Sequence, residues 1–126
     1  MPASWIEHRG RQVLFFDYGG QKSDEALIAT LEAGSAMMQP LRRPALLYND
    51  FEGSVVGSTF MRRVKEVGRM NARLIDRSAL TGISGLKIIF LNAYLRATGE
   101  RNTRAFATRE EALDFLVGGA SGTPGT

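Results

Sequence analysis

The chain has 126 residues, a formal net charge of +3, one histidine and no cysteine. This length allows one domain, and 44% hydrophobic beside 23% charged residues is ordinary for a globular protein, which excludes a wholly disordered chain. The missing cysteines exclude disulfides, thiolate nucleophiles and cysteine-ligated metals. A charge excess of three is small for a nucleic-acid-binding protein, so no nucleic-acid partner is expected.

The first 40 residues predict two strands and a helix. Residues 5–8 and 12–18 are rich in apolar and aromatic side chains and are joined by a turn that contains glycine, which is typical of a hairpin. Ser23 offers an N-cap for a helix over residues 24–38, and Pro40 ends it.

The middle of the chain predicts a strand, a helix and another strand. Residues 45–50 form a nearly continuous apolar run, as expected of a strand that is covered on both faces. Ser58 or Thr59 can cap a helix that reaches about Leu74, and residues 78–83 predict the next strand.

The last third predicts a helix over residues 86–97, a short strand over 104–107 and a final helix. Thr108 and Glu111 have the spacing of a capping box at the start of that last helix. Residues 118–126 are small and polar, and we expect them to form a flexible tail.

The resulting order, β-β-α-β-α-β-α-β-α over residues 1–117, predicts one α/β domain. Strands that alternate with helices imply a mostly parallel sheet with four helices packed on it. The leading hairpin supplies one antiparallel edge strand.

Several motifs follow one another in a set order along this domain. They are Phe16-Asp17-Tyr18-Gly19-Gly20 at the end of the second strand, Asn49-Asp50-Phe51-Glu52 at the end of the third, Phe60 in the second helix, Gly82-Ile83-Ser84-Gly85-Leu86 at the start of the third helix, and Phe106-Ala107-Thr108 before the fourth. With these motifs the sequence resembles the stand-alone bacterial SpoIIAA-like family of STAS-type domains. The resemblance implies a fold shared with anti-sigma-factor antagonists, which bind a partner kinase, and similar to CRAL-TRIO-type carriers of lipophilic ligands.

The resemblance also implies a phosphorylation site at the start of the second helix. Ser58 and Thr59 stand where the antagonists carry their phosphorylated serine, and Arg62 and Arg63 are one turn away and could pair with a phosphate. The Asp-Ser-Ser-Gly pattern of the antagonists is absent, and the alternative is that Ser58 or Thr59 only caps the helix.

A second candidate anion site is the glycine-containing turn that holds Ser84 and Gly85. Backbone N–H groups at such a helix start can hold an anion. The alternative, which we favour, is that the glycines simply permit a tight turn and close packing.

The third helix is apolar on more than one face. Leu86, Ile89, Phe90, Ala93 and Ala97 form one stripe, which we expect to pack on the sheet. A second stripe needs another cover: a neighbouring helix, a second subunit, an apolar ligand or a membrane surface. This second stripe consists of Ile88, Leu91 and Leu95.

Three carboxylates, Asp17, Asp50 and Glu52, lie near the ends of predicted parallel strands. Ligands of open α/β sheets bind at this edge, so a small-molecule enzyme that uses these carboxylates is the alternative function. Turn chemistry explains the same residues, and we place no nucleophile or second base beside them.

We therefore expect a non-enzymatic regulatory or ligand-binding module, with no metal and no cofactor. Its expected contacts are Ser58, Thr59 and Phe60 and the apolar residues Ile88, Leu91 and Leu95. The expected partner is a protein, an apolar small molecule, a membrane surface or a second copy of the chain. The expected location is the cytoplasm or the membrane surface that faces it.

Overall fold

The computed structural model describes residues 2–118 of the chain. Its elements are β1 (Ala3–His8), β2 (Arg11–Asp17), α1 (Asp24–Met38), β3 (Ala45–Asp50), α2 (Ser58–Met70), the 3₁₀ helix η1 (Ala72–Leu74), β4 (Ile75–Thr81), α3 (Leu86–Thr98), β5 (Thr103–Ala105) and α4 (Arg109–Gly118). This is the predicted order with one short 3₁₀ helix added. Helix α4 includes Gly118, and the rest of the predicted tail, residues 119–126, lies outside the described residues.

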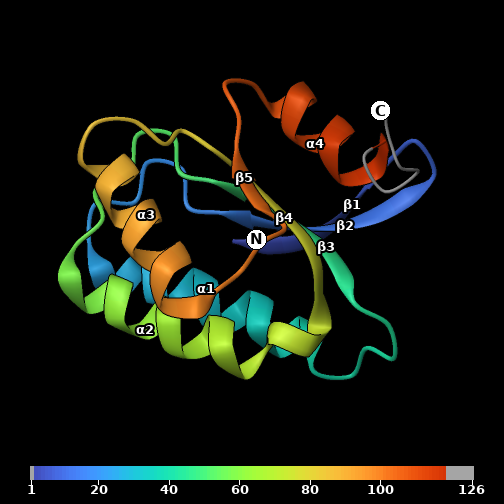
Figure 1. Cartoon of the computed structure of the whole chain (residues 1–126), viewed down its shortest axis with the longest axis horizontal. Coiled ribbons are helices and arrows are strands. Elements are labelled where there is room, and N and C mark those ends of the chain that lie inside the picture. The colour runs from blue at the N-terminus through green and yellow to red at the C-terminus, as the bar shows by residue number, and fades with distance from the viewer. Residues whose placement is uncertain (1, 119–126) are drawn as a thin grey trace.

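The strands form one sheet in the order β1-β2-β3-β4-β5 (Figure 1). Strand β1 is antiparallel to β2, and the pairs β2–β3, β3–β4 and β4–β5 are parallel. The predicted parallel sheet with one antiparallel edge strand is therefore confirmed.

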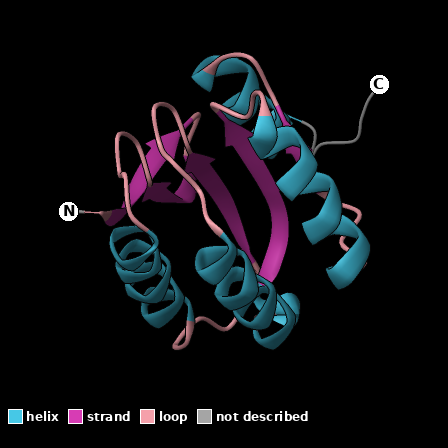
Figure 2. Ribbon diagram, turned by 90° about the vertical axis from the view of Figure 1, so that its left-hand side faces the viewer, coloured by secondary structure: helices cyan, strands magenta, loops and turns pink. Residues whose placement is uncertain are grey.

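Helices cover both faces of this sheet (Figures 1 and 2). Leu14 and Phe16 of β2 pack with α1, α2 and α3 on one face, whereas Val13 of the same strand packs with α4 on the other. Successive side chains of a strand point to opposite faces, so one strand feeds both cores. Strand β3 is buried on both faces over residues 45–48, as the continuous apolar run predicts.

Two predicted helix caps are present. The Ser23 hydroxyl accepts a hydrogen bond from the backbone N–H of Ala26 at the start of α1, at 3.2 Å. The Thr108 hydroxyl accepts one from the N–H of Glu111 at the start of α4, also at 3.2 Å. Local side-chain chemistry thus sets where both helices begin.

The predicted cap of α2 is wrong. Gly57 occupies the N-cap position, and neither Ser58 nor Thr59 makes a capping hydrogen bond. The carboxylate of Asp24, in the first turn of α1, accepts instead from the N–H of Gly57 at 2.8 Å and from that of Phe60 at 3.0 Å. A neighbouring helix therefore satisfies the free N–H groups that begin α2.

Helix α2 also ends earlier than predicted. It stops at Met70, and η1 continues to Leu74. The buried side chain of Asn71 lies at this junction, where it donates to the hydroxyl of Ser35 and accepts from Gln39. These two hydrogen bonds, to α1 and to its C-cap residue, pair the buried amide of Asn71, which would have no partner among purely apolar neighbours.

Candidate functional site

A cavity lies between the sheet and the three helices α1, α2 and α3. Its volume is about 100 Å³. Most of the side chains that line it are apolar or aromatic, from all three helices, from strands β2, β3 and β4 and from the loops. The apolar lining includes Phe16, Tyr18, Leu31, Met38, Leu47, Phe51, Val56, Phe60, Met61, Val64, Val67, Leu80, Ile83, Phe90 and Leu91. Concave apolar sites of this kind with a few polar groups are the usual binding sites for small molecules.

Helix α3 covers one side of the cavity. The residues of α3 that line it are Lys87, Phe90, Leu91 and Tyr94, which recur at the spacing of one helix face. The predicted division of α3 into two stripes is therefore wrong in part, because Leu86 and Ile89 were expected on the sheet and are 71% and 61% exposed.

The other predicted stripe of α3 is split by the structure. Leu91 lines the cavity, Leu95 is half-buried and Ile88 is 50% exposed. Helix α3 thus presents apolar side chains to the cavity on one side and to solvent on the other.

A carboxylate lies among the polar groups of the lining. The hydroxyl of Tyr94 donates a hydrogen bond to the carboxylate of Glu100, and Thr103 donates to its other oxygen at 2.6 Å. Burial, and then the neighbouring Glu100 charge, raise the pKa of Tyr94, so its hydroxyl stays protonated at neutral pH.

Gly68 of α2 makes room for this pair. A Cβ atom at Gly68 would overlap the hydroxyl of Tyr94. The glycine therefore lets α3 lie close to α2 at the end of the cavity where Glu100 is found.

Tyr18 is the unusual polar residue of the cavity. It is 1% exposed, it stacks on Phe51 with ring centroids 4.4 Å apart, and it packs edge-on against Phe60. Burial raises the pKa of its phenol, which is therefore neutral. Within residues 2–118, the hydroxyl of Tyr18 has no hydrogen-bond partner.

The other buried polar side chains of the described residues are satisfied. Tyr48 bonds the hydroxyl of Thr81 at 2.7 Å, and the remaining ones each have at least one partner: Thr30, Ser54, Asn71 and Ser78. Nearly all buried polar groups in proteins are hydrogen-bonded, so the unpaired phenol of Tyr18 is unusual and is free to donate a hydrogen bond to a ligand.

Lys87 brings the only ammonium group among the cavity-lining residues. Its Nζ atom donates to the backbone carbonyl of Phe51 at 2.9 Å. The carbon stem of the side chain covers apolar surface while the charged end bonds the loop, so Lys87 holds α3 against the loop that follows β3.

The predicted phosphorylation residues lie outside the cavity. Ser58 and Thr59 are exposed, whereas Phe60, expected as a surface contact, is 1% exposed and lines the cavity. Because the Asp24 carboxylate already accepts from the N-terminal N–H groups of α2, a phosphate on Ser58 would meet a like charge there.

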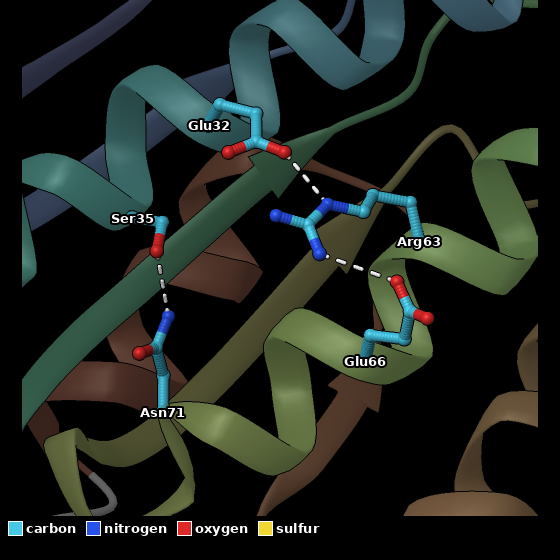
Figure 3. A network of polar contacts seen from close by, with 5 residues as sticks. All are labelled: Glu32, Ser35, Arg63, Glu66 and Asn71. Atoms are coloured by element: carbon cyan, nitrogen blue, oxygen red, sulfur yellow. Dashed lines mark hydrogen bonds and ion pairs between the residues drawn. The ribbon is translucent and has the colours of Figure 1, made fainter.

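Of the two arginines expected to pair with an anion, Arg63 already has acidic partners (Figure 3). It lies between Glu32 of α1, at 2.6 Å, and Glu66 of α2, at 3.2 Å. The hydrogen bond from Arg63 lowers the pKa of Glu32. Arg62 is exposed. The contacts of Arg63, together with the bond from Asn71 to Ser35 in the same figure, join α1 to α2.

The turn that carries Ser84 and Gly85 is explained by backbone geometry. Gly82 and Gly85 both have positive φ values, 76° and 59°, which favour glycine. A Cβ atom at Gly82 would overlap the backbone of Glu52. Ser84 and Gly85 are exposed and are not among the residues that line the cavity.

The strand-end carboxylates take part in turns. Asp17 accepts from the N–H of Gly19 at 3.0 Å, and Asp50 accepts from the N–H of Glu52 at 3.0 Å and from the hydroxyl of Thr81 at 3.1 Å. Within residues 2–118 no group of three or more potential ligands is placed to hold a metal ion.

Sequence reasoning missed Gly68, Tyr94 and Glu100 as site residues, and it identified Tyr18 only as part of the motif that ends the second strand. The one available signal was Tyr94, a polar aromatic residue within an otherwise apolar helix. Nothing in the sequence indicates that its side chain lines the same cavity as Tyr18, which is 76 residues away in the chain.

The comparisons with known proteins bear on the fold. No family model matches the chain, and no curated protein matches it. Among solved structures, it is similar to an uncharacterized protein of the DUF3478 family from Shewanella loihica, which is described as having a SpoIIAA-like fold. The two agree with a TM-score of 0.66 over 90% of this chain and 91% of the other, at 16% sequence identity.

The chain has a SpoIIAA-like fold. The resemblance inferred from the motifs is thereby confirmed for the fold. In this SpoIIAA-like fold the cavity lies on the face of the sheet covered by three helices, opposite α4. Across residues 2–118, no helix combines the length and the apolar composition that crossing a bilayer requires.

Proposed function

We propose that this protein is a non-enzymatic module that binds a small lipophilic molecule in the cavity beneath α3. The observation that carries the proposal is the apolar cavity itself, which holds a buried phenol without a partner among the described residues. Well-packed cores contain few voids larger than a water molecule, so an apolar void of this size favours a ligand.

The packing of α3 supports ligand entry. No residue of α3 is fully buried, whereas α1, α2 and α4 each have at least three buried residues. A helix with few buried contacts is displaced at lower free-energy cost than its neighbours. Helix α3 lies outside the sheet (Figure 1), so its displacement would uncover the cavity, which α3 lines, without breaking the sheet.

Binding of a neutral fluorescent probe, N-phenyl-1-naphthylamine, tests this function. Val64 lines the cavity from α2, so Val64→Phe should fill the space and weaken probe binding at least about tenfold. Val55 is 56% exposed outside the cavity lining, and Val55→Phe is the matched control with no expected change. Equal probe binding by wild type and Val64→Phe, or no binding by wild type, would contradict the proposal.

A second function, contact with an anionic membrane surface, is favoured by the outer side of α3. Leu86, Ile88 and Ile89 expose apolar side chains near its start, and α2 and α3 together carry six basic residues and one acidic residue. Apolar insertion combined with positive charge is how amphipathic helices bind anionic lipids. Co-flotation with phosphatidylglycerol vesicles, lost in Ile88→Asp/Ile89→Asp and absent with phosphatidylcholine vesicles, tests it. Equal flotation of the variant and the wild type would rule it out.

A further inference from the structure

The chemistry of the ligand follows from three groups in the cavity, provided that the proposed function is correct. They are the phenol of Tyr18, the hydroxyl of Tyr94 and the carboxylate of Glu100, and all three residues belong to the lining. Each of them sets a different condition on a bound molecule.

The unpaired hydroxyl of Tyr18 favours a ligand that carries a hydrogen-bond acceptor. Its hydroxyl is fully enclosed and has no partner within the described residues, and its ring is fixed by Phe16, Phe51 and Phe60. A buried O–H without an acceptor is costly, so a ligand atom that accepts from it gains affinity. A pure hydrocarbon would leave this group unpaired.

The carboxylate of Glu100 disfavours an anionic ligand, and its unused lone pairs can accept a hydrogen bond from a ligand. Its two oxygens accept from Tyr94 and Thr103, one hydrogen bond each, while a carboxylate can accept about four. A ligand carboxylate in this apolar surrounding would be repelled by the Glu100 charge. A ligand O–H could instead donate to Glu100 or to the lone pairs of Tyr94.

Tyr18, Tyr94 and Glu100 line the same cavity, and the carboxylate of Glu100 is hydrogen-bonded to Tyr94. A ligand in this cavity therefore shares it with an unpaired donor, Tyr18, and with a negatively charged acceptor, Glu100.

We infer that the ligand is an uncharged apolar alcohol, whose hydroxyl accepts a hydrogen bond from Tyr18 in a cavity that Glu100 also lines. An ammonium group would suit Glu100 but has no lone pair for Tyr18, and a carboxylate would suit Tyr18 but not Glu100. The amine of Lys87, the one ammonium of the lining, is held by the carbonyl of Phe51 and does not offset the Glu100 charge.

Displacement of N-phenyl-1-naphthylamine by three molecules of one chain length tests the inference at pH 8. They are 1-decanol, decanoate and decylamine, and we expect 1-decanol to displace the probe at a concentration at least about tenfold lower than either ion. Decanoate or decylamine binding as tightly as 1-decanol would overturn the inference. Failure of the probe itself to bind would instead overturn the proposed function.

Two variants assign the effect to the named groups. Tyr18→Phe should weaken 1-decanol binding about three- to tenfold once the variant's own probe affinity is taken into account, because one hydrogen bond is lost. Glu100→Gln should reduce the difference between the concentrations of 1-decanol and of decanoate that displace the probe. An unchanged 1-decanol affinity in Tyr18→Phe, or an unchanged difference in Glu100→Gln, would contradict the assignment.

The ligand-free protein gives an independent measurement. Tyr18→Phe should leave the urea midpoint unchanged or higher, since it removes an unpaired buried hydroxyl. The control Tyr48→Phe, an equally buried tyrosine with a partner in Thr81, should lower the midpoint. A fall of the Tyr18→Phe midpoint as large as that of Tyr48→Phe would show that bound water or another group already satisfies Tyr18, and would overturn the inference.

Discussion

Asp24 connects the first turns of two helices. Its carboxylate accepts from the N–H groups of Gly57 and Phe60, while its backbone belongs to the first turn of α1. An acidic residue in a first turn is predicted from sequence to favour its own helix through the helix dipole. That it also caps another helix, 33 residues further along the chain, depends on the packing of α1 against α2 and could not be predicted.

Replacement of the Asp24 carboxylate should therefore lower the free energy of unfolding more than removal of the Ser58 hydroxyl, which is nearer in the chain. Asp24→Ala should lower the free energy of unfolding by about 1–2 kcal/mol, because two N–H groups of α2 lose their acceptor. Ser58→Ala should change it by less than about 0.5 kcal/mol, since Ser58 makes no cap. Urea unfolding measures both, with Glu25→Ala, an exposed neighbour in the same turn, as the control for charge alone. A larger loss of unfolding free energy in Ser58→Ala than in Asp24→Ala would show that Ser58, and not Asp24, caps α2.

Helix α3 shows where sequence patterns stop being informative. The order of the helices and strands followed from local features, such as the cap at Ser23 and the break at Pro40, and the observed order agrees with it, although the start and end of α2 did not follow. The faces of α3 did not follow, because nearly every side chain there is apolar and several stripes are equally plausible. Hydropathy does not indicate that the charged residue Lys87 lines the cavity, while its amine bonds a backbone carbonyl.

The contact between α2 and α3 predicts that a glycine-to-alanine substitution, which usually stabilises a helix, destabilises this one. In an ordinary helix Gly→Ala is stabilising by about 0.5–1 kcal/mol. Gly68→Ala should instead destabilise by about 1–3 kcal/mol, since the new methyl group overlaps the hydroxyl of Tyr94. In a Tyr94→Phe background, which removes that hydroxyl, Gly68→Ala should be neutral or stabilising. Urea unfolding of the four proteins completes the double-mutant cycle, and additive effects would show that Tyr94 is not the obstacle.

At the scale of the whole molecule, the sheet separates two cores with different contents. The face covered by α1, α2 and α3 contains the cavity, and the face covered by α4 is lined by Val13, Leu46, Tyr48 and Leu116. That both faces would be covered was predictable from the apolar run of β3. Which face would hold the cavity was not, because a void depends on how side chains from distant elements fit together.

This separation predicts that stability and ligand binding can be changed independently. Leu116 is fully buried against the face without the cavity, so Leu116→Ala should lower the free energy of unfolding by about 2–5 kcal/mol. Its probe affinity should stay within about twofold of the wild type, because the strands of the sheet lie between Leu116 and the cavity. Leu31→Ala, the matched change among the lining residues, should cost comparable stability and also alter probe affinity. Urea unfolding and probe titration at a temperature where all proteins are folded measure both quantities. A change of affinity in Leu116→Ala as large as that in Leu31→Ala would mean that the two cores act as one packed unit across the sheet.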